Sequence, residues 1–337
     1  MTTPATARES KNDRTVVERL SSLLEQDLAA VEALLLAKAA SPVDIIPDMS
    51  QHIVSAGGKR LRPMITLAAA QAVGSANPST HSLAAAVEFI HTATLLHDDV
   101  IDESDLRRGK PAAKSIWGNS ASILVGDFLF ARAFTLMVET GSLEILEILS
   151  NASSVIAEGE VRQLASQGKP DLPTEDYLAI IEAKTAALFE AAARAGAISG
   201  GGDAHADALA AYGKNLGLAF QIVDDVLDYG GNTSVIGKVV GDDFREGKIT
   251  LPVIIARRRG RAEDQVFWAR AFDLGKQEES DLARAIHLIR TTGAAEATIA
   301  EAEAYVGMAK SALTSLPDTP WRAMLSELAD FCTRRVS

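Results

Sequence analysis

Cysteine is almost absent from this chain, which has a single one, Cys332, among its 337 residues. With no second cysteine the chain forms no internal disulfide, which suits a reducing compartment such as the cytoplasm. Aromatic residues are also scarce, at 5% of the sequence, although apolar residues as a whole reach 47%. We therefore expect a large core that is filled mostly by Ala, Leu, Ile and Val.

An excess of positive charge is also missing, because the formal net charge is −12. This argues against nucleic acid as a partner, although local basic patches for small anions remain possible. No run of 18 apolar residues lacks a charge, so no membrane span is expected. The polar stretch 1–13 has no apolar segment typical of a signal peptide, and we expect a disordered tail there in a cytoplasmic protein.

Helical periodicity dominates the rest of the sequence. In the first segment Leu20, Leu24 and Leu28 recur at steps of four, and the pattern continues along nearly the whole chain. Boundaries read from such patterns are uncertain by about 2–4 residues. Long helices are expected at roughly 64–73, 80–100, 113–139, 142–166, 174–198, 206–228 and 249–258.

Proline and glycine fall between these expected helices. Ser41 and Pro42 are typical of a helix start, and the pair Gly57 and Gly58 ends the helix that would follow. Loops are expected at 103–112, 167–173 and 229–248, and no convincing strand alternation appears. We therefore predict an all-α fold with one domain over residues 14–337.

A cluster of aspartates closes one strongly apolar helix. Asp98 and Asp102 are four residues apart and share a helix face, with Asp99 between them. The plainest interpretation is a solvated helix end. However, like charges at this spacing repel, and carboxylates near a helix C-terminus face the negative end of its dipole. We therefore expect a cation that offsets both penalties.

The same D-D-x-x-D pattern recurs at Asp224, Asp225 and Asp228, again at the end of a long apolar helix. Two such clusters are far more specific than one. Carboxylates without accompanying His or Cys suit Mg²⁺, which often binds one or two of them together with substrate phosphates. The pair of clusters predicts two walls that hold metal and a diphosphate between them.

Basic residues follow or flank both clusters, in four patches. Any one of them alone is best interpreted as solvated, and the sequence contains no P-loop pattern. Together with the aspartates, a mixed set of Arg and Lys suits two diphosphates. The patches are Lys59, Arg60 and Arg62; Arg107, Arg108 and Lys110; Lys184 beside Thr185; and Lys238 with Lys248.

These motifs resemble those of the trans-prenyl diphosphate synthases, also called polyprenyl synthetases. The resemblance extends from about Gly57 to Pro252. It rests on GGKRLRP, HTATLLHDDVIDESDLRRG, VGDFLFARA, GEVRQL, KTAALF, FQIVDDVLD and GKVVGDDFREGKITLP. It implies a single bundle of long helices around a central apolar cavity, a homodimer, and three Mg²⁺ ions in each active site.

The resemblance also implies the roles of individual residues. Metal would be held by Asp98, Asp99, Asp102, Asp224, Asp225 and Asp228. The allylic diphosphate would be bound by Arg107, Lys184, Thr185, Gln221, Lys238 and Lys248. Isopentenyl diphosphate would be bound by Lys59, Arg62, His91 and Arg108, whereas Arg60 fits neither set as clearly. The catalytic group would comprise Asp98, Asp99, Asp102, Arg107, Lys184, Asp224, Asp225 and Lys238.

The expected reaction joins isopentenyl diphosphate head to tail to an allylic diphosphate. Cations stabilise the departing diphosphate, and the allylic carbocation that remains is attacked by the double bond of isopentenyl diphosphate. Ala93 and Thr94 are small residues one turn before Asp98, at positions where bulky side chains shorten the product in the family. The motifs look most like octaprenyl-to-decaprenyl synthases, which implies a chain of about C40 to C50 for a quinone side chain.

Other functions are compatible with parts of this pattern. A terpene cyclase or a head-to-head condensing enzyme would also use aspartate clusters, but neither explains GGKRLRP with His91. A shorter-chain synthase, making farnesyl or geranylgeranyl diphosphate, would share all the motifs. A silent regulatory subunit would be expected to lose aspartates or Arg107, and this chain keeps them.

Overall fold

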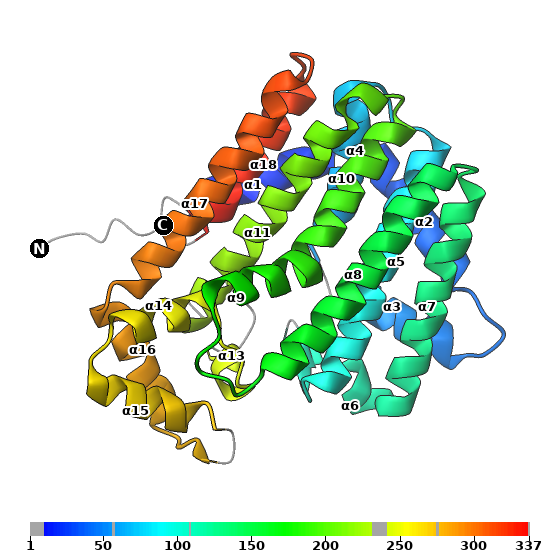
Figure 1. The fold of residues 1–337 in the computed structure, drawn as a ribbon. Coiled ribbons are helices and arrows are strands. Elements are labelled where there is room, and N and C mark those ends of the chain that lie inside the picture. The colour runs from blue at the N-terminus through cyan, green and yellow to red at the C-terminus, as the bar shows by residue number, and fades with distance from the viewer. Residues whose placement is uncertain (1–9, 56–57, 108, 231–240, 274–275, 336–337) are drawn as a thin grey trace, which may run out of the picture.

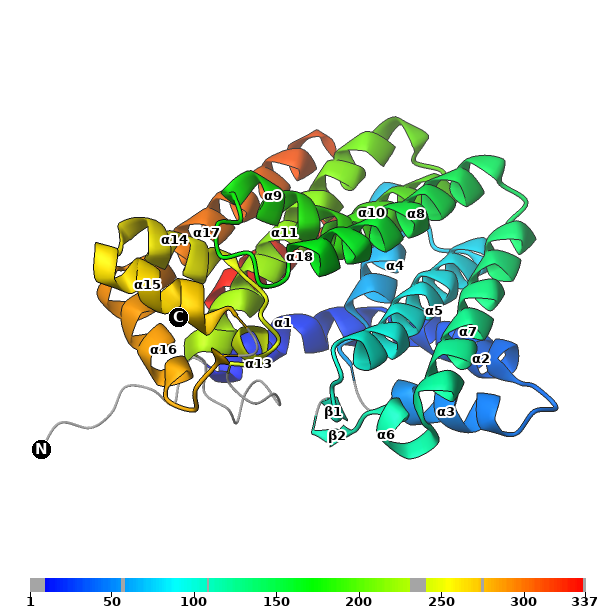
Figure 2. The same cartoon turned by 60° about the horizontal axis from the view of Figure 1, so that its bottom comes forward.

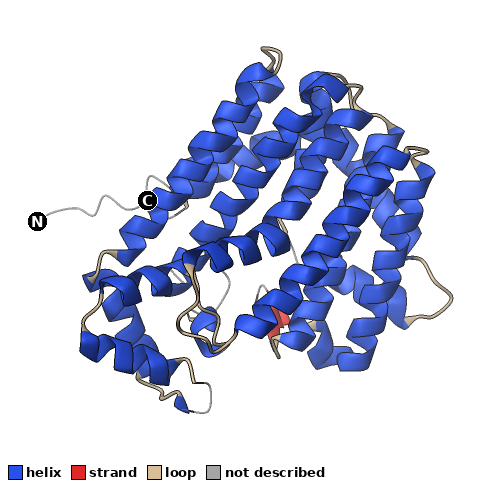
Figure 3. Cartoon of the chain, viewed as in Figure 1, coloured by secondary structure: helices blue, strands red, loops and turns tan. Residues whose placement is uncertain are grey.

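The structure is a computed structural model that describes residues 10–55, 58–107, 109–230, 241–273 and 276–335. Within those ranges the chain is almost wholly helical (Figure 3), so the all-α prediction is confirmed. The long helices lie side by side as a bundle, and shorter helices gather at one end (Figure 1). The only strands in the described part of the chain form a two-residue antiparallel hairpin.

The helices of the first half are α1 (Ser10–Leu23), α2 (Glu25–Ala39), α3 (Ile45–Ser55), α4 (Leu61–Val73), α5 (Pro78–Ile101), α6 (Ala113–Trp117), α7 (Asn119–Glu139) and α8 (Leu143–Ser166). Strands β1 (Leu106–Arg107) and β2 (Lys110–Pro111) lie between α5 and α6. The second half begins with α9 (Thr174–Ile181), a π-helical turn η1 (Glu182–Ala186), α10 (Ala187–Ser199), the 3₁₀ turn η2 (Asp203–His205) and α11 (Ala206–Gly230). It ends with α13 (Asp242–Arg245), α14 (Leu251–Arg259), α15 (Ala262–Ala271), α16 (Asp281–Thr291), α17 (Ala294–Ala312), the 3₁₀ turn η4 (Leu313–Ser315) and α18 (Pro320–Arg334).

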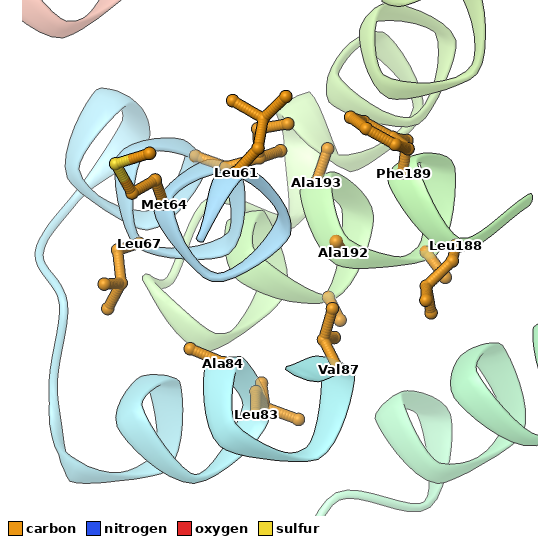
Figure 4. Close-up of a cluster of buried hydrophobic side chains, with 14 of the residues drawn as sticks. Leu61, Met64, Leu67, Leu83, Ala84, Val87, Leu188, Phe189, Ala192 and Ala193 are labelled. Carbon is orange, nitrogen blue, oxygen red and sulfur yellow. The ribbon is translucent and has the colours of Figure 1, made fainter. Parts of the chain in front are cut away.

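The centre of the bundle is built from α4, α5, α10 and α11. Figure 4 shows Leu61 and Met64 of α4 with Val87 of α5 and Phe189 of α10 in one buried cluster. Small residues let these helices approach closely. A Cβ on Gly196 would lie 2.3 Å from the carbonyl oxygen of Thr66, so α10 packs directly on the backbone of α4.

A second cluster of buried residues lies toward the C-terminus, where α14, α15 and α16 pack together. It contains Trp268, whose ring contacts those of Phe267 and Phe272. Tyr305 of α17 packs against both clusters. The expected single domain over 14–337 therefore has a core of two neighbouring parts.

Several boundaries differ from those expected. Helix α1 begins at Ser10, so it takes up the end of the stretch 1–13 that was expected to be a tail. Helix α3 begins at Ile45 and not at Pro42, because Ser41 accepts a hydrogen bond from the Val43 amide and the chain bends there first. The run 113–139 is broken at Gly118, whose φ of 84° lies outside the helical region.

Candidate active site

The first aspartate cluster lies where α5 ends, at Asp98, Asp99 and the C-cap residue Asp102. The β1–β2 hairpin folds back on this end, and Arg107 donates from Nε to Oδ1 of Asp99 at 2.6 Å. Burial raises the pKa of Asp99, while the Arg107 guanidinium works in the opposite direction. The hairpin therefore brings a cation directly onto the cluster, as the need for an offsetting charge predicted.

Asp98 faces a second set of charges. Burial raises its pKa; the nearby Lys184 opposes that shift, and the Asp102 carboxylate adds to it. Lys184 itself pairs with Glu160 of α8, with 2.5 Å between Nζ and Oε2. Glu160 belongs to the GEVRQL motif, yet the sequence reasoning assigned it no role. The signal was present in the motif, but only the fold brings α8 beside the cluster.

Lys184 and Thr185 lie on the π-helical turn η1 between α9 and α10. Such turns are rare and are often found at functional sites. Gly159 of α8 makes the approach possible, because a Cβ there would lie 2.7 Å from Cβ of Ala183. The periodicity of the sequence predicted a continuous helix over 174–198, since one extra residue in a turn leaves no visible mark in the apolar pattern.

In the second cluster Asp225 is the most enclosed carboxylate. It is 2% exposed, and its two oxygens accept hydrogen bonds from the Tyr177 hydroxyl at 2.6 Å and from Gln221 Nε2 at 2.8 Å. Thr185 in turn donates to Oε1 of Gln221 at 2.8 Å. Burial and the charge of Asp243 raise the pKa of Asp225 well above its ordinary value. The sequence reasoning did not single out Tyr177.

The other two aspartates of this cluster have different partners. Asp224 pairs through Oδ1 with Nη2 of Arg335, at 2.7 Å, so the end of the chain reaches the site. Asp228 accepts hydrogen bonds from the backbone amides of Asp242 and Asp243 at 3.2 and 3.1 Å. These amides open the short helix α13, and they fix α13 against the end of α11.

Lys248 connects the first cluster to the segment around α13 that holds Asp228. Its Nζ lies 2.7 Å from Oδ2 of Asp102 and 2.7 Å from Oε2 of Glu246, and its backbone amide donates to the carbonyl oxygen of Asp243. Burial alone would lower the pKa of Lys248, but Asp102 and Glu246 outweigh it and the net shift is upward. Figure 2 shows the hairpin and α13 at the same end of the bundle.

The basic patch after the glycine pair lies at the start of α4 and contacts α5, α10 and α18. Lys59 Nζ is 4.6 Å from the centre of the Phe331 ring. Arg62 contacts Nε2 of His91 at 3.2 Å and stacks over Phe189. Arg62 and His91, predicted to bind one substrate, thus lie side by side. Arg108 and Lys238, also predicted to bind substrates, lie outside the described residues.

The residues expected to set chain length lie on α5. Ala93 is fully buried, and Thr94 is half-buried with its hydroxyl donating to the carbonyl oxygen of His91. His97 points elsewhere, because its ring rests where a Cβ on Gly126 of α7 would be. It therefore contributes to packing between α5 and α7.

The donor set of the two clusters fits a hard divalent cation. All candidate ligands are carboxylates, and burial together with mutual repulsion raises the pKa of Asp98, so added positive charge would relieve the cluster. Within the described ranges no three His, Cys, Asp or Glu side chains converge into a ready-made site.

Comparisons with known proteins agree with this geometry. The family model described as "Polyprenyl synthetase" matches residues 43–289. The octaprenyl diphosphate synthase of Escherichia coli strain K12 is 46% identical over 320 residues, which cover 95% of this chain and 99% of the relative.

Two solved structures are also similar. A polyprenyl synthase from Caulobacter crescentus CB15, complexed with calcium and isoprenyl diphosphate, has a TM-score of 0.92 and 55% identity and covers 95% of this chain and 98% of its own. A decaprenyl diphosphate synthase from Rhodobacter capsulatus has a TM-score of 0.91 and 50% identity, with 95% and 99% covered.

Proposed function

The chain belongs to the polyprenyl synthetase family, and from that premise we propose that it condenses isopentenyl diphosphate successively with an allylic diphosphate. It is a prenyltransferase that makes a long all-trans polyprenyl diphosphate. We assign the product to about C40 to C50, because the similar synthases make octaprenyl and decaprenyl chains. A quinone side chain is the use that we propose for it.

One observation carries this proposal. Lys248 of the segment that holds Asp228 of the second cluster, on α11, pairs with Asp102 of the first cluster, on α5, and a separate Arg62–His91 pair lies on α4 and α5. A single diphosphate would need only one set of cations. Two sets on one face of the bundle fit two diphosphate substrates, which a condensation requires and a cyclisation does not.

Charge balance explains how the first cluster would act on the allylic substrate. The aspartates of the cluster would hold Mg²⁺, which when bound would add positive charge beside the departing diphosphate. The side chains of Arg107, Lys184 and Lys248 now pair with Asp99, Glu160 and Asp102. They would turn toward the diphosphate and contribute donors to the same oxygens.

Residues around the second substrate would position it for attack. Arg62, with His91 beside it and Phe189 beneath it, would hold the diphosphate of isopentenyl diphosphate so that its double bond faces the allylic carbon. Attack forms the new carbon–carbon bond, and the proton then lost would pass to the departing diphosphate. Apolar walls along α5 and α10 would exclude water, which otherwise captures the cation.

The product assay tests this function directly. The protein is incubated with labelled isopentenyl diphosphate and, in parallel, with each allylic primer, and the dephosphorylated products are sized. Chains of about eight to ten isoprene units would support the proposal. A ladder that stops at farnesol or geranylgeraniol would point to the shorter-chain alternative, and no incorporation with any primer would overturn the enzyme assignment.

We also propose a homodimer. By length and composition, helix α7 could cross a membrane, although it carries Asp127 and Arg132. Only 39% of its most apolar 18-residue stretch is buried in the monomer. Exposed apolar residues line α7 and its neighbour α8, including Leu124, Val138, Leu143, Val161 and Leu164. A second copy would cover them and leave a soluble, cytoplasmic enzyme.

Light scattering tests the dimer. The wild-type chain of 35.6 kDa is expected at twice that mass. Leu124→Glu combined with Val161→Glu should shift it to the monomer. Leu23→Glu is the matched control, because Leu23 of α1 is similarly exposed at 56% but lies on another helix. A monomeric wild type would contradict the proposal.

A further inference from the structure

Arg60 has different partners from the other cations of its patch. Its guanidinium pairs through Nη1 with Oε1 of Glu88, a residue of α5 that is 4% exposed. Nη2 donates at 2.8 Å to the carbonyl oxygen of Val54, near the end of α3. Both partners belong to the protein, so the guanidinium of Arg60 is already paired within the fold.

The backbone at Arg60 is unusual as well. Its φ of 47° and ψ of 35° place it in the left-handed region, where a non-glycine residue is uncommon. Such a conformation persists only where the surroundings determine it strongly, and it is concentrated at functional sites. Here it forms the N-cap of α4 and makes no side-chain capping bond. The Arg60 carbonyl oxygen accepts a hydrogen bond from the Met64 amide, and the side-chain contacts to Glu88 and Val54 hold the residue from the other side.

The contact with Glu88 is aligned with a neighbouring one. Glu88 and His91 are three residues apart on α5 and share a helix face. Arg60 pairs with the first, and Arg62 contacts the second at 3.2 Å. The start of α4 is therefore clamped to α5 at two successive points. Lys59 directly precedes Arg60, so the Arg60–Glu88 contact lies between the two other cations of the patch in sequence.

We propose that Arg60 and Glu88 form a positioning pair that orients Lys59 and Arg62 toward the diphosphate of isopentenyl diphosphate. The inference rests on the proposed function. Arg60 would then have a different role from Lys59 and Arg62. Lys59 and Arg62 would contact the substrate, whereas Arg60 would hold the segment that carries them. Because it acts on one substrate site alone, its loss should affect isopentenyl diphosphate and spare the allylic primer.

Arg60→Gly is the most informative variant. Glycine adopts a positive φ without strain, so the backbone conformation is retained while the anchor is removed. We expect the KM for isopentenyl diphosphate to rise by about ten- to a hundredfold, because small misplacements of binding groups have effects of this size. The KM for the primer should stay within about twofold of the wild-type value. Calorimetry with isopentenyl diphosphate alone should show the same weakening.

Glu88→Gln tests the other half of the pair. It should change the same KM in the same direction. The double variant should be no more impaired than Arg60→Gly alone, since both substitutions remove the Arg60–Glu88 contact. Arg270→Ala is a matched control. Arg270 also pairs with a buried carboxylate, that of Asp281, and donates to a carbonyl oxygen, that of Lys276, but it lies on α15.

The outcomes separate positioning from simple stabilisation. If Arg60→Gly lowers Tm and changes both KM values in parallel, or leaves both unchanged, the pair does not orient the substrate site. Arg270→Ala shows how much of any change follows from lost stability alone. A wild-type protein that neither binds nor consumes isopentenyl diphosphate would instead overturn the proposed function, and this inference with it.

Discussion

The hydroxyl of Tyr177 donates a 2.6 Å hydrogen bond to Oδ2 of Asp225, and the amide of Gln221 occupies the other oxygen at 2.8 Å. Asp225 therefore holds three segments together: α9 through Tyr177, η1 through Gln221 and Thr185, and its own helix α11. A carboxylate so enclosed orients its neighbours. The consequence is that Tyr177, which is not itself expected to bind metal or substrate, should affect activity.

Tyr177→Phe should lower kcat by about ten- to a hundredfold. A hydrogen bond to a buried charged group is worth about 1.5–3 kcal/mol, and its loss lets Asp225 and Gln221 shift. Steady-state kinetics with a single primer would measure the change. Tyr212→Phe is the control, because Tyr212 is also buried and its hydroxyl donates to the Leu325 carbonyl oxygen away from the site. Equal losses in both variants would reduce the effect to stability.

Metal removal should abolish activity. A chelator would leave the carboxylates of the first cluster repelling one another around the diphosphate, and added Mg²⁺ should restore turnover. Asp98→Ala should lower kcat by orders of magnitude while the circular dichroism spectrum stays helical. Full turnover by this variant, or by the chelated wild type, would contradict the assignment of the aspartates to metal.

The two diphosphate sites should separate in the kinetics. Arg62→Ala and His91→Ala should raise KM mainly for isopentenyl diphosphate, because these side chains contact each other and are assigned to its site. Arg107→Ala should act mainly on the allylic substrate, since Arg107 lies on Asp99. Initial rates with each substrate varied in turn would measure both constants. A reversed pattern would mean that the two sites have been exchanged.

Glu190 provides a test by pH that does not involve the active site. Burial raises its pKa, while Lys214 and Arg194 oppose the shift and Glu182 adds to it. A carboxyl whose pKa is higher in the folded state binds its proton more tightly there. Its contribution to stability is therefore complete below the unfolded pKa of about 4.3 and is lost as pH rises through the folded value.

Glu190→Gln should accordingly raise Tm at pH 7.5, and the gain should disappear near pH 4. Thermal unfolding followed by circular dichroism at several pH values would show it. A gain that is the same at both pH values would indicate that glutamine simply packs better at this position.

The helical pattern of the sequence was sufficient to predict the fold class and most of the helices. The boundaries that it missed depend on single residues: Gly118 breaks one run, and the chain bends after Ser41 before α3 begins. The hairpin at Arg107 has only two residues in each strand, which is too short for an alternating pattern to appear. These features depend on one or two residues each, so they do not appear in an apolar pattern that is read over several helical turns.

For the candidate site, the sequence indicated some residues and not others. The aspartates stand out because their charges are misplaced for a helix end, and the basic patches follow from them. Tyr177, Glu160 and Arg335 could not be found in this way, since each is an ordinary residue on its own helix until folding brings it to a carboxylate. Glu160 and its partner Lys184 are 24 residues apart in the sequence, and Tyr177 and Arg335 are farther from the aspartates that they contact.

The last prediction concerns product length and the path of the growing chain. Ala93 and Thr94 precede Asp98 by five and four residues, so they lie about 6–7.5 Å below it along α5. A chain whose diphosphate is held at Asp98 and which grows along α5 would pass this turn. Ala86 lies seven residues further on, about 10.5 Å along the axis and on nearly the same face. Both alanines are fully buried.

Ala93→Phe should therefore place a ring across the path and shift the products to markedly shorter chains, while the first condensations stay fast. Ala86→Phe should also shorten them, but less, because its ring would stand farther from the diphosphate. Sizing the dephosphorylated products of both variants would check the order. An added ring in a tightly packed core costs about 1–3 kcal/mol, so an unchanged Tm together with shorter products would indicate that the ring occupies the path of the chain. Unchanged product ladders in both folded variants would mean that the chain grows along another face of the bundle.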